Sequence, residues 1–248
     1  MTTVQVEEFT ARFMMKRQHH EVSHYGGNMG SVAAYFDLDG TLLDASSEKT
    51  LTASLLYRRP WRLFVGLPAW FIRFFIGLIR RQSVYDAARN RGHFTLAKWD
   101  ILSAYSQRLV DEKLQHRIPK EAKERLEWHR SQGHRLVLVT ATVAPMAEAM
   151  SVCLGMDAVY GCGPKVREGV ISGSEKDWSV PRRKGKVPVV EQDAVKNKHD
   201  LELCWAYGNT FADSFFMEKC GNPIAVNPEG PLKKLAVERD WPIFSWRV

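Results

Sequence analysis

Short apolar runs alternate with longer amphipathic stretches along most of the chain. The runs that read as buried strands cover residues 32–37, 135–140, 158–160, 203–207 and 224–226. Helical patterns follow at about 143–154 and 214–220, and a long, mostly helical stretch separates the first two strands. Strands that alternate with helices predict an α/β fold, a Rossmann-like parallel sheet with helices on both faces.

The long stretch after the first strand predicts an inserted domain. We expect a core made of residues 31–45 and 129–248, and an α-helical cap made of residues 46–128. Residues 1–30 lack the apolar region of a secretory signal and are expected to form a partly disordered extension. A β-branched segment interrupted by Gly169, residues 166–173, predicts a hairpin after the third strand.

Two carboxylates, Asp37 and Asp39, stand one residue apart where the first strand is expected to end. The carboxyl ends of the strands are where α/β sheets place their chemistry. One carboxylate can act as a nucleophile and the other as a proton carrier, while Gly40 and Thr41 let the chain turn away. Taken alone, the same residues also fit an Asp-rich β-turn.

Three later segments carry residues suited to phosphate chemistry. Thr140 ends the second strand, and a basic loop holds Lys184 and Lys186, either of which can bring an ammonium group to a phosphate. Asn209 and Asp213 follow the strand at 203–207, four residues apart. Oxygen ligands in such a loop suit Mg²⁺, which takes few protein carboxylates and keeps several waters.

Taken in order, these segments resemble the motifs of the haloacid dehalogenase superfamily. The matching residues are Asp37-x-Asp39-Gly-Thr41, Thr140, Lys186 and Asn209-x-x-x-Asp213. The resemblance covers roughly residues 32–245 and is closest to subfamily IB, the phosphoserine-phosphatase-like hydrolases. It implies a Mg²⁺-dependent phosphomonoester hydrolase that acts through an aspartyl-phosphate intermediate.

The resemblance also implies a role for each motif residue. Asp37 would attack phosphorus, and Asp39 would protonate the leaving group and then activate water. Thr140 and Lys186 would hold phosphate oxygens, with Lys184 as the second choice for the lysine. Mg²⁺ would lie between Asp37, the Asp39 carbonyl, Asn209 and Asp213, and the predicted substrate contacts are completed by Thr41, Arg58 and Arg59.

The sequence departs from the phosphoserine phosphatase pattern at three places. Asn209 stands where the family often has Asp, which predicts a weaker metal site and leaves open a catalytically silent phosphate- or lipid-binding relative. Ser46 replaces the Glu that holds the substrate amine, although Asp44 or Glu48 could substitute for it. Thr140-Ala141-Thr142 replaces Ser-Gly-Gly. These changes argue against free phosphoserine as the substrate.

The cap carries an unusual charge pattern. No acidic residue lies between Lys49 and Tyr85, and the seven basic residues there equal the formal net charge of +7. Within this stretch, residues 63–79 form an apolar run that would span about 25 Å as a helix, short of the ~30 Å core of a bilayer. The basic residues are Lys49, Arg58, Arg59, Arg62, Arg73, Arg80 and Arg81.

This pattern favours a peripheral membrane contact through residues 57–81, with Trp61 and Trp70 at headgroup depth. The alternative is a buried cap helix whose arginines line the entrance for the phosphate. Because the arginines flank one apolar run, nucleic acid is not an expected partner. The cap looks like that of phosphatidylglycerophosphate phosphatases of the same superfamily, which implies a lipid phosphate substrate; the alternative is a small soluble phosphate, phosphoserine-like or a sugar phosphate.

Composition and cysteine usage fit this interpretation. An apolar content of 45% and a charged content of 25% are those of a globular protein. The four cysteines have no C-x-x-C spacing and are expected to be reduced. Zinc is not expected, because the eight histidines do not pair with the cysteines at the spacing of a zinc finger. We therefore expect a cytoplasmic protein with a peripheral position at the inner face of a membrane.

Overall fold

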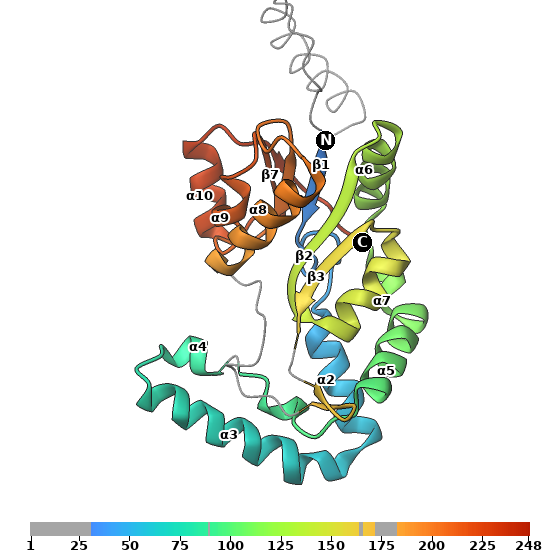
Figure 1. Cartoon of the computed structure of the whole chain (residues 1–248), viewed down its shortest axis with the longest axis vertical. Coiled ribbons are helices and arrows are strands. Elements are labelled where there is room, and N and C mark those ends of the chain that lie inside the picture. The colour runs from blue at the N-terminus through green and yellow to red at the C-terminus, as the bar shows by residue number, and fades with distance from the viewer. Residues whose placement is uncertain (1–30, 89, 164–165, 172–182) are drawn as a thin grey trace, which may run out of the picture. The chain divides into compact units, whose positions relative to one another are not determined.

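The computed structural model describes residues 31–88, 90–163, 166–171 and 183–248 (Figure 1). The predicted extension at 1–30, the end of the predicted hairpin at 172–173 and Arg182 of the basic loop lie outside the described residues.

A parallel sheet in the order β3-β2-β1-β6-β7-β8 forms the centre of the described chain. The predicted α/β class and parallel sheet are confirmed. The edge strand β8 was not predicted from the sequence. The strands are β1 (Ala33–Phe36), β2 (Arg135–Val143), β3 (Ala158–Cys162), β6 (Trp205–Gly208), β7 (Asn222–Val226) and β8 (Ile243–Phe244).

Helices cover both faces of this sheet (Figure 1). Strand β1 is fully buried, as expected for the centre of a parallel sheet, and its side chains alternate between two cores. Phe36 packs with Leu138 on the face covered by α6 (Lys120–Ser131) and α7 (Ala144–Leu154). Tyr35 packs with Val137 on the face covered by the remaining core helices, α8 (Lys186–Asn197), α9 (Ser214–Met217) and α10 (Gly230–Glu238).

The chain between β1 and β2 is helical, as predicted. It contains α2 (Ser47–Arg58), α3 (Leu63–Ile79), α4 (Val84–Ala88) and α5 (Trp99–Glu112), with short 3₁₀ turns at Pro60–Arg62 (η1), Gly92–Phe94 (η2) and Leu114–Arg117 (η3).

The predicted boundary of the insertion at residue 128 falls inside α6, which packs against β2 of the core. Leu126 and His129 are buried on the inner face of α6, whose other positions are mostly charged. The pattern of α6 resembles that of a cap helix, so the sequence alone did not separate α6 from the insertion.

The described part of the predicted hairpin, residues 166–171, is confirmed. Strands β4 (Val166–Arg167) and β5 (Val170–Ile171) pair antiparallel. The Ile171 backbone N–H donates to the Ala97 carbonyl at 2.9 Å and its own carbonyl accepts from Leu96 at 3.0 Å. The hairpin therefore packs against the segment that precedes α5.

Candidate active site

The carboxyl ends of β1, β2 and β6 meet at one edge of the sheet. Phe36, the last residue of β1, pairs with Leu138 of β2 and with Tyr207 of β6. Asp37 follows β1 directly, Thr140 lies two residues beyond Leu138, and Asn209 follows β6. The parallel register therefore brings residues from distant parts of the chain to this edge.

Lys186 joins two carboxylates of this edge. It is the first residue of α8, and its Nζ donates to Asp37 Oδ1 at 2.5 Å and to Asp213 Oδ1 at 2.7 Å. Asp213 Oδ2 accepts from the backbone N–H and the hydroxyl of Thr210 at 3.0 and 2.7 Å. All three charged side chains are buried. The structure thus joins Lys186 to the carboxylates, whereas Lys184 is exposed, with its Nζ 5.5 Å from the Phe215 ring centroid.

The electrostatics of this group favour the charged lysine. Burial alone would lower the pKa of Lys186, but the Asp213 and Asp37 carboxylates outweigh burial and raise it. Burial raises the pKa of Asp37, against the opposing effect of Lys186. Two carboxylates around one ammonium leave a net negative charge in a buried place. A cation added beside Asp37 would favour the ionised carboxylate that nucleophilic attack requires.

Asp39 faces the cap. Its Oδ1 accepts from the backbone N–H of Ser47, the first residue of α2, at 3.1 Å. Burial raises the pKa of Asp39 to about 6, and the hydrogen bond from Ser47 opposes this rise. A carboxyl group with a pKa near 6 can both give and take a proton near neutral pH.

The loop after Asp39 packs tightly against the loop after β6. Gly40 has φ +83°, and a Cβ there would lie 2.1 Å from Asn209 Nδ2, so only glycine fits. Thr41 is buried, and its hydroxyl donates to Asn209 Oδ1 at 3.4 Å. The structure therefore brings Thr41 to the Asn209 side chain.

Thr140 lies buried in β2, where its Oγ1 accepts from the Thr142 backbone N–H at 3.1 Å. The hydroxyl hydrogen of Thr140 remains available as a donor. Thr142 Oγ1 in turn lies 3.0 Å from Ser47 Oγ, which links this strand end to the cap.

The predicted contacts from Arg58 and Arg59 are not brought to this edge. Both lie at the C-terminal end of α2, about 16 Å along the helix from Ser47. There they contact Tyr105: the Arg59 Nε donates to its hydroxyl at 3.3 Å, and the Arg58 guanidinium lies 5.8 Å from its ring centroid.

A cap arginine that the sequence analysis did not single out lies at the site instead. Arg91 contacts Glu48 Oε2 through Nε at 3.1 Å and Nη2 at 2.8 Å, and it also donates to the Ala141 carbonyl. Glu48 Oε2 also accepts a hydrogen bond from the Val143 backbone N–H at 3.2 Å. Asn90-Arg91-Gly92, a polar and glycine-containing break after the apolar run, was the available signal.

The oxygen donors at this edge fit Mg²⁺. Within the described residues, no group of three or more His, Cys, Asp and Glu side chains is placed to hold a metal. Magnesium needs no such group, because it is commonly bound by one or two carboxylates and completes its shell with water. Asp37 and Asp213 supply the carboxylates, and the Asn209 amide and the Asp39 carbonyl are further hard donors.

Comparisons with known proteins identify the family. A family model described as haloacid dehalogenase-like hydrolase matches residues 34–218. Phosphoserine phosphatase SerB1 of Mycobacterium tuberculosis is 26% identical over 223 residues, which cover 88% of this chain and 72% of the relative.

Two solved structures share the fold. A Bordetella pertussis protein of unknown function has a TM-score of 0.72 at 23% identity and covers 87% of this chain and 99% of its own. A substrate-bound phosphoserine phosphatase has a TM-score of 0.60 at 14% identity, over 88% of this chain and 94% of its own.

The family match and the relative confirm the predicted enzyme class, a phosphatase, and the predicted phosphoserine-phosphatase-like group, and the solved structures confirm the fold. Asp37, Thr140, Lys186 and Asp213, which meet at the carboxyl edge of the sheet, all lie within the matched residues 34–218. The chain belongs to the haloacid dehalogenase-like hydrolase family.

Proposed function

We propose that this chain hydrolyses phosphomonoesters through a covalent intermediate on Asp37, with Mg²⁺ as the metal ion. The observation that carries the proposal is the buried Asp37–Lys186–Asp213 group, which places a carboxylate at the end of β1 beside a fixed positive charge. A carboxylate can attack a phosphoryl group only when positive charge offsets the mutual repulsion.

The proposed reaction has two steps. In the first, an Asp37 oxygen attacks phosphorus, the bond to the ester oxygen breaks, and Asp39 donates its proton to the departing alkoxide. In the second, Asp39 takes a proton from water, the water oxygen attacks the aspartyl-phosphate, and inorganic phosphate leaves with Asp37 restored. Lys186 and the Thr140 hydroxyl donate to phosphate oxygens.

Mg²⁺, held by Asp37, Asp213, Asn209 and the Asp39 carbonyl, would neutralise phosphate charge. Asp213 has a second role that needs no metal, because it fixes the Lys186 ammonium and is itself fixed by Thr210. Asp39, held by the Ser47 N–H, is directed toward the start of the cap, where a leaving group would lie.

Free phosphoserine is disfavoured as the substrate. The two acidic residues that could hold its amine are already engaged: Glu48 pairs with Arg91, and Asp44 pairs with Arg117 at 3.3 Å. We propose a lipid phosphomonoester, such as phosphatidylglycerophosphate, because the cap presents an exposed apolar helix. A small soluble phosphate, phosphoserine-like or a sugar phosphate, is the second candidate.

The test compares wild type with Asp37→Asn, a nearly isosteric change that removes the nucleophile. Wild type with Mg²⁺ should turn over p-nitrophenyl phosphate and form an acid-stable, hydroxylamine-labile phosphoenzyme. Asp37→Asn should lose at least about 10³-fold in turnover and form no phosphoenzyme. An inactive wild type would identify a catalytically silent relative. Turnover of more than a few per cent by the variant would remove Asp37 from the mechanism.

Substrate class is decided by a separate measurement. Initial rates on a phosphatidylglycerophosphate dispersed in detergent, a sugar phosphate and phosphoserine should rank in that order. Equal or higher kcat/KM on a soluble ester would favour the second candidate without changing the assignment of Asp37.

A further inference from the structure

Helix α3 has its small residues inside and its large apolar residues outside. Gly66 and Gly77 are the buried residues of α3. A Cβ on Gly66 would lie 2.8 Å from the His93 carbonyl oxygen, and one on Gly92 would lie 2.6 Å from the Trp70 Cα. The segment around η2 therefore packs directly on the backbone of α3 at these positions.

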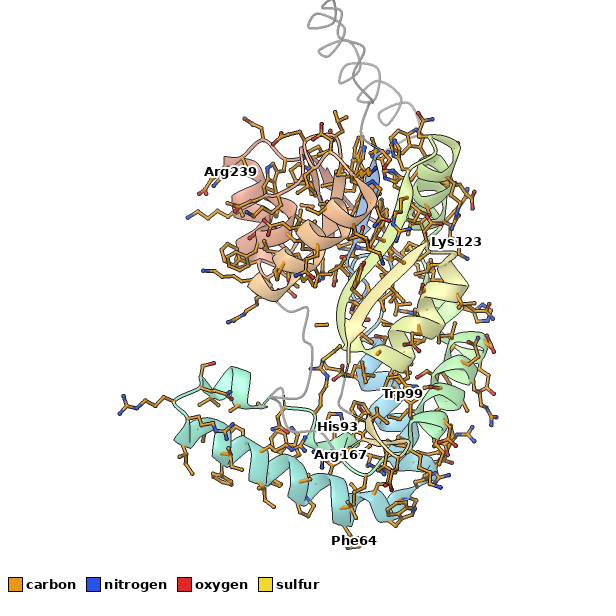
Figure 2. The ribbon with its side chains drawn as sticks, in the orientation of Figure 1. Phe64, His93, Trp99, Lys123, Arg167 and Arg239 are labelled. Carbon is orange, nitrogen blue, oxygen red and sulfur yellow. The ribbon has the colours of Figure 1, made fainter. Side chains whose placement is uncertain are left out.

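The opposite face of α3 is apolar and exposed. Seven large apolar side chains recur there at spacings of three and four residues, which places them on one side of a helix. Phe64 is 84% exposed and Ile79 is 81% exposed. Figure 2 shows Phe64 directed away from the rest of the chain and His93 on the other side of α3. The seven residues are Phe64, Leu67, Phe71, Ile72, Phe75, Ile76 and Ile79; we call them the outer face.

An apolar stripe of this length is unusual on a soluble surface and marks an interaction site. Both ends of the outer face carry exposed side chains of the kinds found at the charged surface of a membrane. Arg58 and Trp61 are exposed at the start, and Arg80 and Arg81 are exposed just after Ile79.

Trp70 and Arg62, two residues of the predicted membrane contact, also have contacts within the cap. Trp70 lies toward the inner face, where its Nε1 donates to the Ala88 carbonyl at 3.2 Å. Arg62 is buried, and its Nη2 donates to the carbonyls of His93 and Thr95. The position of Trp61 and Trp70 at headgroup depth stays a prediction, and Arg62 serves the packing of the cap.

The contacts of α3 argue against a membrane span. Residues 60–79 form a helical stretch that is long and apolar enough to cross a bilayer by length and composition. However, Arg62 is hydrogen-bonded to the η2 segment, and Asn90 Nδ2 donates to the Trp70 carbonyl at 3.2 Å. A crossing helix would carry these polar partners into hydrocarbon or break their hydrogen bonds. A helix that lies along the surface keeps them.

Charge decides between a bilayer and a second copy of this chain. In a two-fold pairing of outer faces, the arginines at both ends of α3 would meet arginines, since α3 and its flanks contain no acidic residue. An anionic lipid surface supplies the opposite charge and an apolar layer at once.

We propose that the outer face is a docking surface for an anionic lipid bilayer, with α3 parallel to the membrane plane. The apolar side chains enter the acyl boundary, and Arg58, Arg80 and Arg81 contact lipid phosphates. This inference goes beyond the proposed function, because it requires neither Asp37 nor turnover.

The test is co-sedimentation of the full chain with vesicles of phosphatidylcholine containing 30% phosphatidylglycerol, as a chosen probe, at about 50 mM salt. Wild type should bind, and about 0.5 M salt should weaken binding. Phe71→Ser with Phe75→Ser should weaken it at least about tenfold. Arg80→Gln with Arg81→Gln should weaken it about 30-fold, at roughly 1 kcal/mol per arginine.

Val195→Ser with Val237→Ser is the matched control, because both residues are exposed valines on core helices. The control should bind like wild type, and all variants should keep the thermal midpoint of wild type. Wild type that stays in the supernatant, or outer-face variants that bind like the control, would overturn the proposal. A dimer in solution that Phe71→Ser with Phe75→Ser dissociates would assign the outer face to a second copy. Asp37→Asn should bind vesicles normally, so loss of turnover and loss of docking are separate results.

Discussion

One carboxylate, that of Glu48, accepts hydrogen bonds from Arg91 and from the Val143 backbone N–H through the same oxygen. This ion pair joins α2 of the cap, the segment before η2 and the carboxyl end of β2. Arg91 also donates to the Ala141 carbonyl, beside Thr140. The cap is thereby fixed to β2, the strand that carries Thr140.

Replacing Glu48 with Ala should lower the free energy of unfolding by about 3 kcal/mol, because a largely buried arginine then loses its charge partner. Asp44→Ala is the matched control. It breaks the Arg117 pair, whose two side chains are about half exposed, and should cost less than about 1 kcal/mol. Urea unfolding measures both, and equal losses would contradict the structural role of Glu48.

Lys186→Met should abolish turnover and lower the free energy of unfolding by about 3–5 kcal/mol, because Asp37 and Asp213 would face each other without a cation. Lys184→Met should change the free energy of unfolding by less than about 0.5 kcal/mol, because Lys184 is exposed. It should leave the hydrogen bonds from Lys186 to Asp37 and Asp213 in place. Thermal unfolding and turnover of p-nitrophenyl phosphate check both variants. If the two variants behave alike, Lys186 is not the lysine of the site.

Asn209→Asp should tighten Mg²⁺ binding at least about fivefold, because it adds a charged oxygen to the proposed metal ligands Asp37 and Asp213. In chelator, the same change should lower the thermal midpoint, since a third carboxylate then lies there without a metal. Thr41→Val alters the neighbour of the Asn209 amide without adding charge and should leave Mg²⁺ affinity near wild type. Titration calorimetry gives both affinities; unchanged binding by Asn209→Asp would place Asn209 outside the metal shell.

A buried histidine under the sheet gives the protein a distinct response to acid. His129 is fully buried, with Nε2 2.8 Å from the Tyr207 hydroxyl and Nδ1 2.8 Å from His134 Nδ1. Arg125 Nε donates to the same hydroxyl at 2.7 Å, so the Tyr207 proton is given to His129 Nε2. Burial, with Arg125 and His134 nearby, lowers the pKa of His129 to about 2.

Because the unfolded chain protonates this histidine near pH 6.5 and the folded chain does not, His129 should destabilise the protein as pH falls below 6.5. The loss is ~1.4 kcal/mol per pH unit, or about 2 kcal/mol between pH 6.5 and 5. His129→Gln removes the titration, so the stability difference between wild type and variant should shrink or reverse over this range. Comparing the two proteins at each pH separates the effect of His129 from that of Asp39. The raised pKa of Asp39 increases the free energy of unfolding as pH falls, which is the opposite of the effect of His129. A difference that is constant with pH would show that His129 titrates when folded.

The sequence was most informative where a side chain follows a buried strand. Asp37, Thr140 and Asp213 could be placed together, because strand ends of a parallel sheet converge whatever lies between them. The choice of Lys186 over Lys184 was less certain from the sequence. The structure separates the two lysines, because Lys186 is buried at the first residue of α8 and Lys184 is exposed.

Residues of the cap were harder to place, because their positions depend on how helices pack. Arg58 and Arg59 lie close to the first motif in sequence, yet α2 carries them away from Asp39. Arg91 is far from Glu48 and Ala141 in sequence and contacts both in the fold. The direction of Trp70 depends on the close contact of Gly92 with α3, which hydrophobic periodicity does not reveal.

The two glycines of α3 have a consequence for which substitutions this cap can accept. Gly66 and Gly77 secure the packing of the helix through its backbone, so its outward side chains take little part in folding. Substitutions at Phe64, Phe71 or Phe75 should therefore change the proposed membrane contact and leave the candidate active site at the carboxyl edge of the sheet intact. Under the proposed docking, the positions that select a membrane surface and the positions that carry out the chemistry are separate sets.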